Sequence, residues 1–295
     1  MLKMAKLRKD MDFNKLMGGV LDALKGVASA EYFRLQSERK AFTDFESNLK
    51  GFFENVRLKD FQHPFFDIAQ GPKNIVLITS DASFLGKLNI SVVQSALEQY
   101  AQGDMLTVIG KQGVRYVEEL GKEFTTFPGI DDNISYENMV SLRDYIIKTF
   151  IKKRLSVTII IYPHFISFAV QVIQQLQIFP CKFLFPYTAG STAKEDVYSG
   201  FSMTETDEDI IIEPSPQAIV EYLVKIWLTR SIHQIFWESK LSEWAARVIH
   251  LEKSVNEIKK QDRILRLKYF RFLHQISDQN IREIFSNRMV LAKNN

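Results

Sequence analysis

The C-terminal part of the chain repeats its hydrophobic residues every three or four positions. Alternating steps of four and three residues from Trp237 reach twelve positions, of which eleven are apolar and only Asp262 is charged. A period of 3.5 residues predicts a long helix with one apolar seam, which supercoils around a partner helix. At 1.5 Å per residue the repeat would extend over ~60 Å, more than the width of an ordinary domain. We therefore expect a projecting coiled coil whose seam is Trp237, Leu241, Trp244, Val248, Leu251, Val255, Ile258, Asp262, Leu265, Tyr269, Phe272 and Ile276.

The first 57 residues predict a second long helix, because they contain no proline and place apolar residues at helical spacing. The set that we expect to face the C-terminal helix is Phe13, Met17, Val20, Leu24 and Val27. The pattern continues through Phe42, Phe45, Leu49, Phe52 and Val56. Small residues that would allow close approach of two helices are Gly26, Ala28, Ser29 and Ala30. Helices at opposite ends of a chain can pair antiparallel only if the middle of the chain is inserted between them.

The middle of the chain alternates between predicted strands and helices. Buried-strand runs at 75–78, 105–109 and 157–162 alternate with helical patterns at 92–100, 114–120 and 136–152. We further expect a helix at 165–176, strands at 182–185 and 210–212, and a mobile surface loop at 188–209. This alternation is typical of a mostly parallel, Rossmann-like sheet covered by helices.

The predicted fold is therefore α/β plus coiled coil, in three segments. An N-terminal coiled-coil helix covers 1–57, an inserted α/β domain covers 58–212, and a C-terminal coiled-coil helix covers 213–295. Pro214 and Pro216 stand at the start of the last helix, where proline is tolerated.

Composition narrows the class of protein only a little. A hydrophobic content of 46% and a net charge of +3 are ordinary for a globular protein and do not indicate a nucleic-acid partner. The single cysteine, Cys181, excludes an internal disulfide, fits a reducing compartment and is expected to be a packed side chain. No apolar run approaches the ~18 residues of a membrane span, and we expect no signal peptide.

The turn after the first strand lies where nucleotide-binding α/β domains hold a phosphate. Residues 79–86 read TSDASFLG, which matches neither G-x-G-x-x-G nor G-x-x-x-x-G-K-[ST]. With one glycine, the backbone could not approach a pyrophosphate closely. The segment favours a plain strand-to-helix turn with Asp81 or Ser83 near a helix N-terminus.

No other pattern predicts chemistry. The five histidines are scattered without metal-ligand spacing, and no nucleophile elbow occurs. We expect no catalytic residue, no cofactor and no metal.

The C-terminal helix carries a basic stripe. Its members are Lys259, Lys260, Arg263, Arg266, Lys268 and Arg271. The stripe fits either a solvated face beside the seam or a surface that attracts an acidic protein partner. Nucleic acid fits less well, because a basic region is not placed at the end of the zipper.

Four short segments, in order along the chain, match motifs of one protein family. The segment ITSDASFLGKLN at 78–89 is similar to I-T-S-D-R-G-L-C-G-G-F-N, and VIGKQG at 108–113 is similar to V-I-G-x-K-G. The segment IEPSP at 212–216 is similar to Y-E-P-x-P, and ESKLSEWAARV at 238–248 is similar to E-S-x-x-S-E-x-A-A-R-M. Together with the helix, α/β and helix order, they make the chain resemble the gamma subunit of F-type ATP synthases over nearly its whole length.

The chain also departs from that family. Residues 26–36 keep only loosely the motif M-V-A-A-A-K-L-R-x-A-Q, and the motif A-M-x-x-A-T-x-N is replaced at 249–256. The R-Q and T-Q-E groups, which in the family bind loops of the catalytic subunit, fall on 273–274 and 278–280, where only Gln279 is retained.

The resemblance implies a non-catalytic rotor shaft, the central stalk of a proton-translocating ATP synthase or ATPase. Alpha and beta subunits would surround the coiled coil, and the α/β domain would contact the epsilon subunit and the membrane c-ring. Such a subunit is peripheral to the membrane, on the cytoplasmic face of a bacterial inner membrane or the matrix face of a mitochondrial one. The expected partner-binding residues are Glu238, Ser239, Ser242, Glu243, Arg247 and Gln279, with Lys259, Lys260, Arg263 and Arg266 of the basic stripe.

Three alternatives stay open at this point. The chain could be the rotor-like subunit of a dedicated paralogous F1-like ATPase. It could be a non-rotary interaction protein whose C-terminal seam is free to homodimerise. It could also be a nucleotide-dependent enzyme that uses the turn at 80–86.

Overall fold

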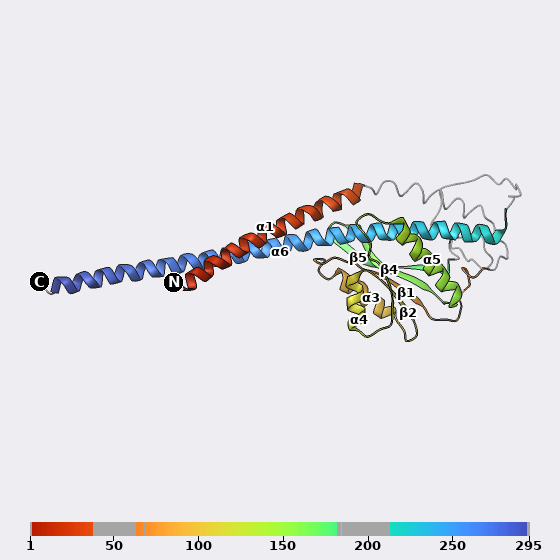
Figure 1. Ribbon diagram of the computed structural model, residues 1–295, viewed down its shortest axis with the longest axis horizontal. Coiled ribbons are helices and arrows are strands. Elements are labelled where there is room, and N and C mark those ends of the chain that lie inside the picture. Colours follow the sequence, from red (N-terminus) through yellow and green to blue (C-terminus); the bar gives the residue numbers. More distant parts are fainter. Residues whose placement is uncertain (1, 38–62, 68, 182–183, 185–212, 294–295) are drawn as a thin grey trace. The chain divides into compact units, whose positions relative to one another are not determined.

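The computed structural model describes residues 2–37, 63–67, 69–181, 184 and 213–293 (Figure 1). The chain divides into two compact units. The coiled-coil unit consists of Met1–Glu31 and Arg247–Asn295, and the α/β unit consists of Tyr32–Ala246. The segment boundaries predicted at residues 57 and 212 lie outside the described residues.

A five-stranded sheet in the order β3-β2-β1-β4-β5 forms the centre of the α/β unit (Figure 1). Strand β1 pairs in parallel with β2 and β4, β2 pairs in parallel with β3, and β5 is antiparallel to β4. The predicted mostly parallel sheet is therefore confirmed. The strands are β1 (Asn74–Ile78), β2 (Met105–Ile109), β3 (Thr125–Phe127), β4 (Thr158–Ser167) and β5 (Val170–Phe179).

Helices precede, connect and follow these strands much as the periodicity predicts. They are α1 (Leu2–Ser37), α3 (Leu88–Gln99), α4 (Lys111–Glu119), α5 (Tyr136–Lys152) and α6 (Pro216–Lys293). The helix predicted at 136–152 is confirmed at both ends. The predicted strand at 210–212, the loop at 188–209, the apolar residues at 42–56 and, apart from Leu184, the strand at 182–185 lie outside the described residues.

The helix predicted at 165–176 is wrong, because this segment forms a β-hairpin. Ser167 pairs with Val170 across a short turn, and β4 and β5 continue as antiparallel partners. Strand β5 reads VQVIQQLQIF, in which polar and apolar residues nearly alternate. A period of two and an excess of β-branched residues favour a strand, and the apolar spacing that suggested a helix arises by chance within it. The three-residue strand β3 was not predicted at all.

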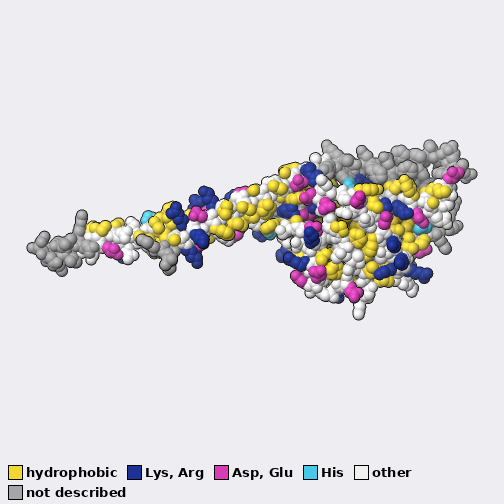
Figure 2. All heavy atoms as spheres, in the orientation of Figure 1, with side chains coloured by type: hydrophobic (Ala, Val, Ile, Leu, Met, Phe, Trp, Pro, Cys, Tyr) yellow, Lys and Arg dark blue, Asp and Glu magenta, His cyan; other side chains and the backbone are white. Residues whose placement is uncertain are grey.

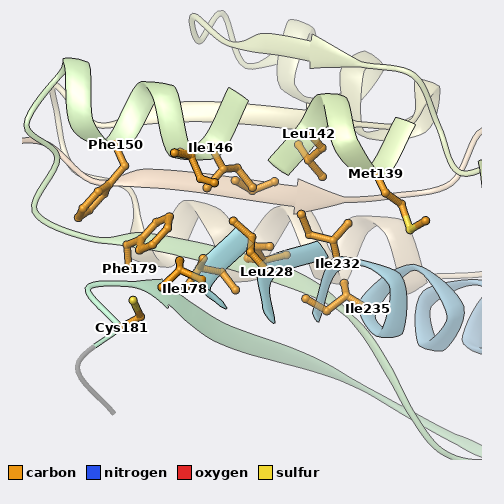
Figure 3. Packing of buried hydrophobic residues seen from close by; sticks show 14 of the residues in the cluster. Met139, Leu142, Ile146, Phe150, Ile178, Phe179, Cys181, Leu228, Ile232 and Ile235 are labelled. Atoms are coloured by element: carbon orange, nitrogen blue, oxygen red, sulfur yellow. The ribbon is translucent and has the colours of Figure 1, made fainter. Parts of the chain in front are cut away.

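The two faces of the sheet are covered by different helices. Val76 and Ile78 of β1 belong to a buried cluster shared with α5 and α6, whereas Ile75 and Leu77 belong to a second cluster with α3. Figure 3 shows α5, with Ile146, and α6, with Leu228, facing each other across the first cluster. Side chains of α6 recur every three or four residues in this cluster, as the core-facing stripe of a helix must: Val220, Val224, Leu228, Ile232 and Ile235.

Two polar side chains after β1 fix the start of α4. Thr79 Oγ1 donates to the Ile109 carbonyl at 2.6 Å and accepts from the Gly113 amide at 3.0 Å. The Asp81 carboxylate accepts from the Lys111 amide at 2.7 Å. These contacts satisfy amides of the first turn, which have no partner within the helix. The close approach of Thr79 also requires a glycine at position 110, since a Cβ there would lie 2.2 Å from the Thr79 carbonyl oxygen.

The C-terminal seam predicted from the 3.5-residue period is confirmed. Within the coiled-coil unit, Val248, Leu251 and Val255 are buried. Farther along α6 the seam positions are half-buried while most residues between them are exposed, as at Ile258 and Leu265. Within the α/β unit, the first members Trp237, Leu241 and Trp244 are buried as well.

The seam predicted on the first helix is wrong. Phe13 and Val27 are each 60% exposed, Val20 and Leu24 are also exposed, and Met17 is half-buried. The side of α1 that is turned inward carries instead Met4, Leu7, Met11, Gly18, Leu21 and Ala28. Helix α1 has apolar residues on two sides. Because the inner side also contains small residues, which add little hydrophobicity, the outer side has the stronger apolar pattern and was predicted to form the seam.

Contacts between α1 and α6 show that the two helices are antiparallel. Lys25 Nζ lies 2.7 Å from Glu252 Oε2, and a Cβ placed on Gly18 would lie 3.8 Å from Ile258 Cγ2. Moving toward the start of α1 therefore moves toward the end of α6. This confirms the predicted antiparallel coiled coil.

We expect Leu251→Asp to lower the free energy of unfolding by about 3–5 kcal/mol, because Leu251 is 1% exposed and a carboxylate there would be buried without a charged partner. Urea unfolding followed by helical circular dichroism measures the change. The control Lys260→Ala alters an exposed side chain of the same helix and should change stability by less than about 0.5 kcal/mol. Equal losses in the two variants would contradict the assigned helix face.

We expect Gly110→Ala to destabilise the protein more than Gly103→Ala. The two glycines have nearly the same backbone angle, φ +94° and +97°, so both variants incur conformational strain of about 1–3 kcal/mol. Only at Gly110 must the new methyl group displace the Thr79 backbone, whereas nothing lies within 4 Å at Gly103. The extra cost should be about 1–3 kcal/mol, measured as the difference between the two urea unfolding curves. Indistinguishable curves would show that the Thr79 contact does not constrain the turn.

Candidate functional site

The predicted partner-binding residues fall into two groups with opposite surroundings. Four residues of the E-S-x-x-S-E signature are buried in the α/β unit: Glu238, Ser239, Ser242 and Glu243. Five residues farther along α6 are exposed in the coiled-coil unit: Lys259, Lys260, Arg263, Arg266 and Gln279. Arg247, which lies between the two groups in the sequence, is half-buried. The structure therefore does not bring the predicted residues together as one site.

The buried signature residues bind the end of strand β4. Glu238 Oε2 lies 2.5 Å from His164 Nδ1, and Glu238 Oε1 accepts from Gln234 Nε2 at 3.1 Å. Ser242 Oγ donates to the Pro163 carbonyl at 3.1 Å. Burial, together with the nearby Glu238 carboxylate, raises the pKa of Tyr162 well above its ordinary value, so its phenol stays protonated. The signature thus attaches α6 to the protein's own sheet through polar contacts with three consecutive residues of β4, Tyr162, Pro163 and His164.

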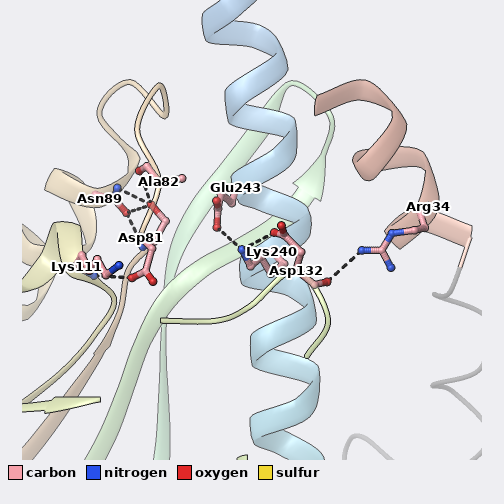
Figure 4. A network of polar contacts seen from close by, with 9 residues as sticks. Arg34, Asp81, Ala82, Asn89, Lys111, Asp132, Lys240 and Glu243 are labelled. Atoms are coloured by element: carbon pink, nitrogen blue, oxygen red, sulfur yellow. Dashed lines mark hydrogen bonds and ion pairs between the residues drawn. The ribbon is translucent and has the colours of Figure 1, made fainter. Parts of the chain in front are cut away.

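Lys240 lies at the centre of a second polar cluster, which the sequence analysis missed. Its ammonium lies 3.2 Å from Asp132 Oδ1 and 3.4 Å from Glu243 Oε2, while its side chain is only 7% exposed (Figure 4). Arg34, near the end of α1, donates to the Asp132 carbonyl at 3.1 Å. The one local signal is the i, i+3 spacing of Lys240 and Glu243 in an apolar helix. The contact with Asp132 spans 108 residues of sequence and leaves no local pattern.

The exposed basic residues are partly balanced by acidic neighbours. Arg266 Nε bonds Asp262 Oδ2 at 2.7 Å, and Lys260 Nζ lies 4.0 Å from Glu257 Oε2. Figure 2 shows basic and acidic side chains side by side along this unit. A mixed surface of this kind attracts an acidic partner less strongly than the basic residues alone suggest.

The turn after β1 is filled by contacts within the chain. The Ser80 amide donates to Asn89 Oδ1 at 3.1 Å, and Ser80 Oγ donates to the Ala82 carbonyl at 3.0 Å. Asp81 lies at the N-terminus of α4 rather than α3, and neither Asp81 nor Ser83 caps α3, whose cap position is Lys87. Because a carboxylate already occupies the positive end of α4, the turn does not offer a phosphate site.

The remaining candidate groups are structural. Cys181 is fully buried, and burial raises the pKa of its thiol to about 12, which keeps it uncharged and unreactive. Among the residues that the structure describes, no group of His, Cys, Asp and Glu is arranged to hold a metal ion. The described helices include none that is long and apolar enough to cross a membrane.

Curated relatives match this chain over most of its length. The ATP synthase gamma chain of Cytophaga hutchinsonii is 24% identical over 280 residues, which cover 90% of each chain. The ATP synthase gamma chain of Chlorobaculum tepidum is 23% identical over 288 residues, which cover 93% of this chain and 94% of the relative.

Solved structures share the fold. A chain of the Euglena gracilis mitochondrial ATP synthase, in a cryo-EM structure of OSCP, F1 and c-ring, matches with a TM-score of 0.71 at 14% identity and covers 98% of this chain. The match covers 94% of the Euglena chain. A chain of the rotor of the same enzyme matches with a TM-score of 0.66, covering 93% of this chain and 98% of that one.

A family model described as ATP synthase matches residues 3–287. Because that match spans nearly the whole chain, and because the relatives named above are gamma chains, this protein belongs to the ATP synthase gamma family.

Proposed function

We propose that this chain is the non-catalytic central-stalk subunit, the rotor shaft, of a proton-translocating F-type ATP synthase or ATPase. The observation that carries the proposal is the antiparallel coiled coil made by the two ends of one chain, in a member of the gamma family. A shaft must resist twisting, and two helices packed along a continuous seam are stiffer than one. Buried Leu21, Leu251 and Val255 supply part of that seam.

The proposed partners follow from the relatives. The two Euglena structures are those of the ATP synthase rotor and of its OSCP, F1 and c-ring assembly, and this chain shares the fold of a chain in each. We assign to it an alpha–beta hexamer around the coiled coil, with the epsilon subunit and the c-ring against the α/β unit. Both curated relatives are bacterial, which favours a peripheral position on the cytoplasmic face of a bacterial inner membrane.

The surface of the coiled-coil unit suits contact with a surrounding sleeve. Lys259, Lys260, Arg263 and Gln279 are exposed and are our candidates for contacts with the hexamer. Exposed apolar side chains accompany them, including Ile264, Leu267 and Phe270. Non-directional apolar contacts and screened charges allow a surface to slide, whereas deep anchors would hold it in one orientation.

The alternatives have less support. A seam free for homodimerisation is disfavoured, because α1 of the same chain faces the α6 seam. A nucleotide-dependent enzyme is disfavoured, because the candidate phosphate turn is occupied by Asp81 and by internal hydrogen bonds. A dedicated paralogous ATPase has no support from the relatives named above, which are gamma chains of ATP synthases.

We expect the purified chain to hydrolyse no ATP alone and to promote assembly of its cognate alpha and beta subunits into a hexamer. Co-expression followed by size-exclusion chromatography and an ATPase assay measures both effects. The matched controls are alpha and beta subunits without the chain, and the chain carrying Leu251→Asp. Absence of the chain from every alpha–beta hexamer isolated from its native source would refute the rotor function.

A further inference from the structure

We propose that Asp132 is a positioning residue that fastens the end of α1 to α6, so that the two helices turn together. The inference rests on the proposed rotor function and adds to it a mechanical link between α1 and α6. We call the contacts among Arg34, Leu35, Asp132, Trp237 and Lys240 the clasp, and all of them lie within the α/β unit.

The last described turns of α1 are held on their buried side. Tyr32 is 4% exposed and Leu35 is 1% exposed. The centroid of the Tyr32 ring lies 5.1 Å from that of Phe168, which is in the turn between β4 and β5. It lies 6.0 Å from the ring centroid of Phe165 in β4. These apolar contacts attract α1 to the hairpin but impose little direction, because the hydrophobic effect is not directional.

Direction comes from hydrogen bonds to α6 and to the loop before α5. The buried indole Nε1 of Trp237 donates to the Leu35 carbonyl at 3.1 Å. In addition, Arg34 Nη2 donates to the Asp132 carbonyl. Two directional contacts on neighbouring residues of α1 fix the rotation of that helix about its own axis.

Asp132 links the two helices because it contacts a side chain of each. Its backbone oxygen accepts from Arg34 of α1, and its carboxylate pairs with Lys240 of α6 (Figure 4). Lys240 is nearly buried, and a buried ammonium needs carboxylate partners. Glu243 supplies one from the same helix, whereas Asp132 supplies one from outside α6. Of the two contacts of Lys240, the one with Asp132 leads to α1, in addition to the direct bond from Trp237 to Leu35.

The clasp links two helices whose described residues contribute unequally to the core of the α/β unit. In the α/β unit, α6 contributes an extended apolar side to the core, from Val220 to Phe236. The described part of α1 in that unit is only residues 32–37. Turning force exerted on α6 in this unit reaches residues 32–37 of α1 through the clasp. The clasp gives α1 a direct share of that force and limits slippage between the helices.

The experiment compares three variants in the full chain assembled with its alpha–beta hexamer and membrane sector. Asp132→Ala removes the carboxylate but keeps the backbone oxygen that Arg34 uses. Asp132→Glu keeps the charge. Asp131→Ala is the matched control, because Asp131 is the exposed neighbour and its carboxylate accepts from Asn138 of α5. Readouts are hydrogen exchange in peptides covering 32–37 and the ratio of protons pumped to ATP hydrolysed.

We expect Asp132→Ala to speed exchange at 32–37 by about two- to fivefold, the range for loss of an ion pair whose carboxylate is 67% exposed, with no change in peptides of α3. The pumping ratio should fall while ATP hydrolysis stays near the wild-type rate. Asp132→Glu should restore both readouts, and Asp131→Ala should change neither. A merely structural role would not change the pumping ratio at constant hydrolysis.

Unchanged exchange at 32–37, or a normal pumping ratio in Asp132→Ala, would overturn the inference. The same loss in Asp131→Ala would overturn it as well. If the wild-type chain itself joins no hexamer, the proposed rotor function fails instead, and the exchange measurement on the isolated chain still decides whether Asp132 holds α1.

Discussion

Packing along the apolar side of helix α6 is the interaction on which both units depend. The helix runs from Pro216 to Lys293, and its buried residues enter the sheet core in one unit and the seam with α1 in the other. An isolated helix gains little stability from its own hydrogen bonds, so packing along this side holds it in place. A residue on that side is therefore constrained wherever it lies along the helix.

The sequence predicted the seam of α6 well because its apolar repeat runs from Trp237 to Ile276 with a single interruption. The 3.5-residue repeat from Trp237 matches the buried and half-buried positions, including the polar interruption at Asp262. Helix α1 was predicted as a helix but with the wrong face. Its inner side carries Gly18, Lys25 and Ala28, which contribute little hydrophobic signal. Gly18 fits there because Ile258 lies opposite, and that complementarity is visible only when both helices are seen together.

The sheet was predicted where strands are fully buried and missed where they lie at an edge. Strands β1 and β2 are continuous apolar runs, as expected for strands covered on both faces. Strand β5 is antiparallel and half-exposed, and the spacing of its apolar residues also fits one face of a helix. The candidate site, too, was predicted only in part. The family motif identified Glu238 and Ser242, but no local pattern could pair Asp132 with Lys240, since the pairing depends on the folded chain.

Polar and apolar contacts have different mechanical roles along α6. Apolar packing stabilises a helix against its neighbours but resists rotation about the helix axis only through the shapes of the side chains. Hydrogen bonds depend steeply on angle, so a few of them can fix that rotation. In α6 the buried polar contacts concentrate between Gln234 and Glu243, where the helix meets β4 and the Asp132 loop. In the described coiled-coil unit, contacts such as Lys25–Glu252 are exposed at the surface and are therefore weaker. A protein that must transmit rotation and also turn within its surroundings needs this division: fixed orientation where force enters, and apolar packing with screened charges where the surface must move.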